Sequence, residues 1–378
     1  MSNLVRIAPG ALVIGKPLPW TVYDAEGNVL LTQGYVIQTD VQLEQLFERG
    51  LFYPRRSDAP APEPAANDID ERPRNPFSDY PQLLHTLELA LRAIDRPAPD
   101  ARQRVLGLAN LVIRCCREAP DPCLALVHLY SVEPTAYEQT LFYAIICYFV
   151  GDQLGMEDKR LRVLIGAALT ANLALLPFSD KLNQSRHRLS ESQRAIIHKH
   201  PELAVAALER AGIDNRLLLT IVAQHHEQPD GSGYPAGLSG PDILPEARIV
   251  ALAERYTAMI TRRAYRNRYN ITEARQALAE ASHQLQDRSL HQALLRALTP
   301  YPPGALVRLA NNEVAVVTHR PTGLQGAVAQ AIVNPTGNRY VGAFKRDCTR
   351  PEYQIQQVEV PDDLPSMDFG QLWGFDRS

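Results

Sequence analysis

Two adjacent imidazoles and a carboxylate, His225-His226-Glu227, close an apolar stretch that reads LLLTIVAQHHE. Imidazole nitrogens are among the commonest protein ligands for transition metals. Neighbouring residues on a helix point about 100° apart, so both rings could face one wide metal site. The pair could equally belong to a solvated helix end, and the two histidines alone do not decide between these readings.

A glycine-rich loop follows, Asp230-Gly231-Ser232-Gly233-Tyr234-Pro235, and then Gly237. Closely spaced glycine and proline residues predict a tight turn in which backbone can approach a ligand. Tyr234 adds an aromatic face and a hydroxyl group. The alternative is a plain surface loop, because a glycine-rich pattern is weak evidence by itself.

The combined pattern resembles the HD-GYP family, a branch of the HD phosphohydrolases whose usual substrate is the bacterial second messenger cyclic di-GMP. The resemblance covers about residues 120–299. Its specific part runs from HHE-x-x-DGSGYP-x-GL-x-G through Ala247-Arg248-Ile249 to Arg263-x-Tyr265-Arg266, and upstream it includes the segment His198-Lys199-His200-Pro201-Glu202.

The resemblance implies a metal site made of histidine and aspartate side chains. His200, His225 and His226 match ligand positions of the family, and Glu254 stands where the family has an aspartate. Three imidazoles and one carboxylate suit a single Zn²⁺, Fe²⁺ or Mn²⁺ ion. The alternative is that no metal binds and these side chains hydrogen-bond one another in a polar site.

Other positions of the family's metal site are lost. The defining His-Asp pair is matched by Ala171 and Asn172, a nearby lysine by Leu175, and an earlier ligand histidine by Gln139. A bridging carboxylate offsets the repulsion between two dications, and a neutral asparagine cannot do so. We therefore expect no catalytic dyad and no two-metal site, which makes this a degenerate member of the family.

The residues that would contact a phosphate ligand are better preserved. By resemblance these are Gly233, Tyr234 and Pro235 of the loop and the pair Arg263 and Arg266. Arginine suits phosphate binding because its planar guanidinium offers paired donors. The alternative for the arginine pair is a solvated helix end, where cations complement the helix dipole.

The pattern along the chain predicts a mainly α protein with an all-α, HD-type core and two small β-rich parts. Apolar positions recur at helical spacing in the core, whereas alternating short apolar runs separated by turn residues flank it. A proline-rich stretch with few large apolar side chains predicts a linker. The predicted boundaries are 1–56 for a β-rich regulatory or docking module, 57–78 for the linker, 79–299 for the helical domain, 300–360 for a β subdomain and 361–378 for a tail.

Composition narrows the class of protein. The formal net charge of −3 argues against a general nucleic-acid binder. The five cysteines contain no CxxC pair and are typical of reduced thiols in a cytoplasmic protein. The most apolar segment, residues 163–178, is shorter than the roughly 20 residues that span a bilayer, so we predict a buried core helix there.

Three functions remain open at this point. The first is a catalytically impaired HD-GYP protein that binds cyclic di-GMP or a signalling partner. The second is an active, metal-dependent cyclic di-GMP phosphodiesterase with a one-metal site. The third is a protein-docking scaffold that binds no nucleotide. The family resemblance also implies a homodimer. The remaining histidines are predicted to lie on the surface or in the core: His85, His128, His187, His198, His283, His291 and His319.

Overall fold

The computed structural model describes residues 4–6, 18, 21–24, 28–39, 42, 46, 52–54, 74–132, 134–179, 190–262, 268–281, 287–322, 325–360 and 369–375. The chain divides into two units, one of residues 1–73 with 362–378 and the other of residues 74–361. Helices dominate the second unit, and each unit contains a small antiparallel sheet. The predicted fold class, mainly α with two small β regions, is confirmed.

The first unit contains a four-stranded sheet in the order β1-β4-β2-β3. Its hairpin joins β2 and β3 around the predicted turn, where the backbone N–H of Asn28 donates to Asp24 Oδ1 over 2.7 Å. The predicted helix at 39–50 lies mostly outside the described residues. The elements of this unit are β1 (Leu4–Arg6), β2 (Val22–Tyr23), β3 (Val29–Leu31), β4 (Phe52–Pro54) and α13 (Phe369–Leu372).

The helices of the second unit begin inside the stretch that we assigned to the linker. Asn75 caps the first of them by accepting hydrogen bonds from the backbone N–H groups of Phe77 and Ser78, and Pro76 takes the first helical position, which needs no N–H donor. The helices are α2 (Pro76–Asp95), α3 (Ala101–Glu118), α4 (Pro120–Leu129), α5 (Ala136–Gln153), α6 (Asp158–Thr170), α8 (Glu191–Arg210), α9 (Arg216–Gln224), α10 (Pro245–Ile260), α11 (Ile271–Ala281) and α12 (Arg288–Leu298), with short 3₁₀ turns η1 (Gly240–Asp242) and η2 (Pro351–Tyr353).

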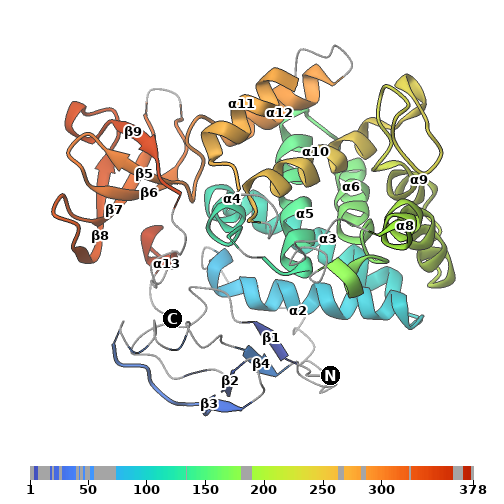
Figure 1. Ribbon diagram of the computed structural model, residues 1–378, viewed down its shortest axis with the longest axis horizontal. Coiled ribbons are helices and arrows are strands. Elements are labelled where there is room, and N and C mark those ends of the chain that lie inside the picture. Colours follow the sequence, from blue (N-terminus) through green and yellow to red (C-terminus); the bar gives the residue numbers. More distant parts are fainter. Residues whose placement is uncertain are drawn as a thin grey trace. The chain divides into compact units, whose positions relative to one another are not determined.

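Helix α5 is the centre of this helical core (Figure 1). Its residues from Ala136 to Gly151 are buried except Tyr137, and a helix that is apolar on all sides belongs in an interior. Helices α2, α3, α4, α6, α10 and α12 all pack against it. Because α6 and α10 share this support, the chain segments that follow or lie within them are held at fixed positions.

The predicted core helix over residues 163–178 is only partly correct. Helix α6 ends at Thr170, residues 171–175 form turns, and Phe178 is 47% exposed. Pro177 explains why the helix cannot run on, since its ring would collide with the carbonyl of Leu173 and it has no N–H to donate. The break leaves Asn172 free to turn away from the helix axis.

Local capping fixes the ends of the helices that carry the histidines. Ser190 and Gln193 form a reciprocal capping box at the start of α8. Asn215 caps α9 by accepting from the backbone N–H of Leu218, and α9 ends at His225. Helices α8 and α9 pack together, and α9 also contacts α6 and α10. Three helices and one helix end therefore meet around the histidines.

The second sheet lies beside the helices in the same unit, with the strand order β8-β7-β6-β5-β9. Two contacts bind it to the core. Arg320 Nε pairs with Asp121 Oδ1 at 2.5 Å, and a Cβ on Gly304 would lie only 2.8 Å from the carbonyl oxygen of Ala125. The strands are β5 (Leu306–Leu309), β6 (Val314–His319), β7 (Val328–Val333), β8 (Arg339–Asp347) and β9 (Ile355–Val358).

Within the part of the chain that the structure describes, no helix combines the length and apolar character that a membrane-spanning segment needs. That finding agrees with the prediction for the apolar stretch around α6.

Candidate metal centre

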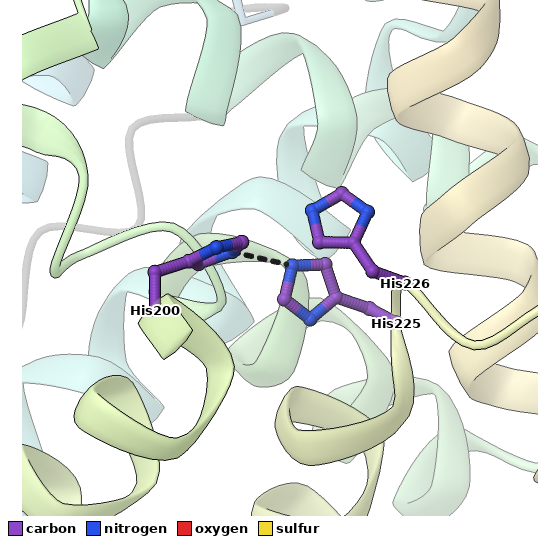
Figure 2. A group of neighbouring side chains, drawn as sticks. All are labelled: His200, His225 and His226. Carbon is purple, nitrogen blue, oxygen red and sulfur yellow. Dashed lines mark hydrogen bonds between the residues drawn. The ribbon is translucent and has the colours of Figure 1, made fainter. Parts of the chain in front are cut away.

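Three imidazoles converge where α8 and the end of α9 meet. His200 comes from α8, and His225 and His226 follow the last turn of α9 (Figure 2). One ring nitrogen of each lies within 4.8 Å of the others, and all three side chains are buried or nearly so. Among the described residues this is the group that meets the geometry of a metal site. The sequence analysis predicted all three of its members.

The backbone fixes which nitrogens of the two inner rings face the centre. His200 Nδ1 lies 2.5 Å from the carbonyl oxygen of Ile197, and His225 Nδ1 lies 2.7 Å from that of Val222. A carbonyl oxygen can only accept a hydrogen bond, so both Nδ1 atoms carry the proton. This arrangement of a ligand histidine, with the outer nitrogen held by a backbone carbonyl, is typical of metal sites.

The inner nitrogens then face one another without a proton between them. His200 Nε2 and His225 Nε2 lie 3.2 Å apart. Burial lowers the pKa of His200 to about 4, and burial together with the nearby His200 lowers that of His225 to about 3, so both rings are neutral at pH 7. A neutral imidazole has one N–H, which Nδ1 already holds. Two lone pairs therefore point together, and a cation between them would remove their repulsion.

The spacing agrees with that interpretation. Two nitrogens bound to one ion at about 2.1 Å lie roughly 3.0–3.4 Å apart, close to the 3.2 Å observed for His200 and His225. The donor set of neutral imidazoles is also one that Zn²⁺, Fe²⁺ and Mn²⁺ accept. The residues present therefore fit a divalent metal ion, and the cluster could bind one.

Glu254 on α10 faces the same centre. Its carboxylate oxygens lie 4.0 Å from His225 Nε2 and 3.7 Å from His226 Nε2. Burial raises the pKa of Glu254 to about 8, while the hydrogen bond from Asn172 acts in the opposite direction. The side-chain amide of Asn172 donates to Glu254 Oε1. A carboxylate with the longer glutamate side chain thus reaches the histidines, and the asparagine lies directly behind it.

The positions that the sequence analysis called lost contain no metal-binding side chains. Ala171 is fully buried at the end of α6. Gln139 is buried on α5, where its amide donates to the carbonyl of Pro134 and accepts from the hydroxyl of Tyr143. Leu175 lies in the turns after α6. Of these positions only Asn172 contacts a residue of the centre.

Glu227 has a role that the sequence analysis did not assign. The side chain is buried, and its two oxygens accept from the backbone N–H groups of Ala236 and Leu238 at 2.7 and 2.8 Å. Both oxygens are used to hold the glycine-rich loop, so Glu227 is no ligand of the centre in this arrangement. The signal in the sequence was the carboxylate directly after the two histidines, which by itself favours a ligand.

The same loop shows why Gly233 is a glycine. A Cβ there would lie 2.3 Å from the backbone nitrogen of Gln228 and 2.5 Å from Glu227 Cα, which no side chain can tolerate. Close approach of two backbone segments therefore requires glycine at this position. The packing brings Tyr234, whose N–H donates to the carbonyl of His226, against the histidine cluster.

Tyr234 contacts imidazoles from two helices. Its ring stacks on His226 with centroids 4.8 Å apart and on His198 with centroids 4.4 Å apart. Burial raises the pKa of the Tyr234 hydroxyl, so the phenol stays protonated at neutral pH. The remaining predicted ligand residues differ in status, because Pro235 lies in the described loop whereas Arg263 and Arg266 lie outside the described residues.

Comparison with known proteins places this centre in a family. A family model described as an HD domain matches residues 126–290, which include every residue of the histidine centre. Residues 126–290 form an HD domain. Relatives of this HD domain include the cyclic di-GMP phosphodiesterase PA4108 of Pseudomonas aeruginosa, 27% identical over 52% of this chain and 48% of the relative. A second is the cyclic di-GMP phosphodiesterase response regulator RpfG of Xanthomonas campestris, 28% identical over 60% and 59%.

The chain thus spans about half the length of the curated relatives that its HD domain matches. Among solved structures, an HDG"Y"P protein from Bdellovibrio bacteriovorus aligns with a TM-score of 0.55 at 16% identity, covering 78% of this chain and 99% of that protein. This likeness concerns the fold alone.

Proposed function

We propose that this chain is an HD-GYP-type bacterial signalling protein whose HD domain holds one divalent metal ion, binds cyclic di-GMP and hydrolyses it poorly. Several relatives of the chain are named cyclic di-GMP phosphodiesterases, which supports the choice of ligand. In this proposal His200, His225, His226 and Glu254 hold the ion. Its identity among Fe, Mn and Zn is left to experiment.

The observation that carries the proposal is the pair of facing lone pairs on His200 and His225. Hydrogen bonds from Nδ1 to backbone carbonyls leave both Nε2 atoms without protons at 3.2 Å. The chain keeps this arrangement buried, where an uncompensated pair of lone pairs destabilises the fold. A bound cation turns the same arrangement into a stabilising one.

The impaired hydrolysis rests on charge. A second ion beside the first would need another anionic ligand to offset the repulsion between two dications. Asn172 offers a neutral amide there, and its N–H groups point at Glu254. Ala171 offers no ligand atom. When bound, a single ion supplies Lewis-acid polarisation of a phosphate oxygen, and this chain's own groups orient the ligand around it.

The ligand contacts in this proposal are those of the loop and the arginine pair. Gly233, Tyr234 and Pro235 would contact the nucleotide, and Arg263 and Arg266 would bind its phosphates through their paired donors. A cytoplasmic location, a homodimer and signalling proteins as partners complete the proposal.

Metal analysis combined with one ligand titration tests it. We expect about one metal ion per purified chain by mass spectrometry, and saturable cyclic di-GMP binding by calorimetry. We expect chromatography to show the nucleotide intact after incubation with the metal-loaded protein. Two ions per chain with rapid turnover would contradict the proposal, as would an absence of binding at high micromolar nucleotide.

A second candidate function is a working one-metal phosphodiesterase, which the names of the relatives favour. Hydrolysis that appears on adding Mn²⁺ or Fe²⁺ and disappears in a His225→Ala variant would establish this function. His319→Ala is the matched control, since His319 is exposed on β6 of the second sheet.

A further inference from the structure

His198 lies outside the predicted ligand set but beside the centre. It belongs to α8, the helix that carries His200, and its side chain is exposed. Sequence analysis gave it no role beyond that of a surface or core histidine. In the structure it is the outermost ring of a group of aromatic side chains that ends at the metal centre.

The rings are ordered from the surface inwards. His198 and Tyr234 lie face to face, with centroids 4.4 Å apart and planes within 7°. Tyr234 in turn stacks on His226 at 4.8 Å and 28°. Such near-parallel contact uses one face of the His198 imidazole. Since the residue is exposed, its other face is open to a ligand.

This open ring is held in place rather than mobile. Its support, Tyr234, is fixed by a backbone hydrogen bond of 3.1 Å to the carbonyl of His226. The loop that carries Tyr234 is fixed in turn by the two hydrogen bonds to Glu227. A preorganised aromatic face loses little conformational freedom when a ligand stacks on it.

A flat ring beside a metal-and-phosphate site suits one chemical feature of a nucleotide. Bases stack on aromatic side chains, and removal of such a contact costs roughly 1–3 kcal/mol per base. Large, two-ring purines overlap an imidazole more fully than pyrimidines do. The phosphate of the same ligand would lie toward the histidine centre, and the base would reach outward.

We propose that His198 is a specificity-determining residue that stacks on a purine base of the bound cyclic dinucleotide. The inference rests on the proposed function, because it assumes that a cyclic dinucleotide occupies the centre. It assigns this chain a preference for purine over pyrimidine ligands and locates the origin of that preference on α8.

Calorimetric titration of the full chain with cyclic di-GMP and with cyclic di-UMP tests the role. We expect wild-type protein to bind the purine ligand more tightly. His198→Ala should weaken cyclic di-GMP binding about tenfold and cyclic di-UMP binding much less, so that the preference collapses. His198→Phe, which keeps an aromatic face, should retain the preference.

The ratio of the two affinities separates stacking from mere support of Tyr234. If His198 only supported the tyrosine, its loss would weaken both ligands alike, and an unchanged ratio in His198→Ala would overturn the inference while the proposed function stood. If wild-type protein bound neither dinucleotide, both the proposed function and the role of His198 would be wrong. His319→Ala is the control for loss of an exposed histidine.

Discussion

The side-chain amide of Asn172 donates a hydrogen bond to the carboxylate of Glu254, which faces His225 and His226 from the other side. An aspartate at position 172 could not donate this bond and would bring a second negative charge to the centre. The relationship therefore shows how the chain tolerates the loss of a carboxylate: the replacing amide is satisfied by the glutamate that remains. A centre organised this way is neutral enough to persist in the absence of a second ion.

Asn172→Asp should destabilise the metal-free protein and increase its response to metal. Loss of a hydrogen bond to a charged group costs roughly 1–3 kcal/mol, and two carboxylates would then repel each other. Thermal unfolding in chelator should show a lower Tm than wild type, and Mn²⁺ should raise the Tm of the variant more than that of wild type. Asn110→Asp on the exposed face of α3 is the matched control. Equal Tm values in chelator would contradict the assignment.

Metal binding at pH 7 should release about one proton. The pKa of Glu254 is raised to about 8, so its carboxyl is largely protonated at pH 7 and must lose its proton to become a ligand. The imidazoles of His200 and His225, with pKa values of about 4 and 3, are already neutral and release none. Metal affinity should therefore rise between about pH 6 and pH 8.

Calorimetry of metal binding in two buffers with different ionisation enthalpies measures this proton. In a Glu254→Gln variant the release should vanish, because the amide has no proton to lose. Release that is the same in the variant and in wild type would show that the proton comes from another group.

Sequence reasoning predicted much of this centre because its members carry strong local signals. Two adjacent histidines after an apolar helix, and a histidine before proline, point to a metal whatever the fold. Glu227 was misleading for the same reason: its position beside His226 favours a ligand, whereas its partners, Ala236 and Leu238, are backbone groups that no side-chain pattern reveals. His198 was missed because stacking on Tyr234 depends on how α8 and the loop pack.

The fold was predictable to a similar depth. Helical spacing and turn residues indicated the all-α core and the sheet of β5–β8, since these periodicities are local. The end of α6 was not predicted, although Pro177 is a local signal for it, because the apolar run around it favours a longer helix. Likewise the start of α2 depends on the cap by Asn75, which lies in a proline-rich stretch typical of a linker.

Glu227→Gln should loosen the glycine-rich loop and destabilise the protein. The amide can accept from only one of the two N–H groups that the carboxylate holds, and a buried N–H left without its acceptor costs roughly 1–3 kcal/mol. Hydrogen exchange at Ala236 and Leu238 should accelerate, and the Tm should fall by a few degrees. Glu209→Gln, at an exposed position on α8, is the control and should change neither measurement. Unchanged exchange at both amides would exclude Glu227 as the anchor of the loop.

Acid should destabilise the core through His128. This buried ring contacts the carbonyl oxygen of Pro303 and the hydroxyl of Tyr256 at 2.8 Å each, and burial lowers its pKa to about 4. The unfolded chain takes up a proton on His128 below about pH 6.5, whereas the folded chain resists it until about pH 4. The free energy of unfolding should therefore fall as the pH decreases across this window, by up to about 3 kcal/mol from this residue.

Urea unfolding in chelator at pH 7.5 and at pH 4.5 measures the effect. Wild-type protein should lose stability between the two conditions, with buried His200 and His225 adding to the loss in the same direction. His128→Gln should be less stable than wild type at pH 7.5, because a contact at the junction of α4, α10 and the second sheet is altered. It should nevertheless lose less stability on acidification, since the glutamine takes up no proton. A variant with the same loss as wild type would show that His128 is not the buried group that titrates.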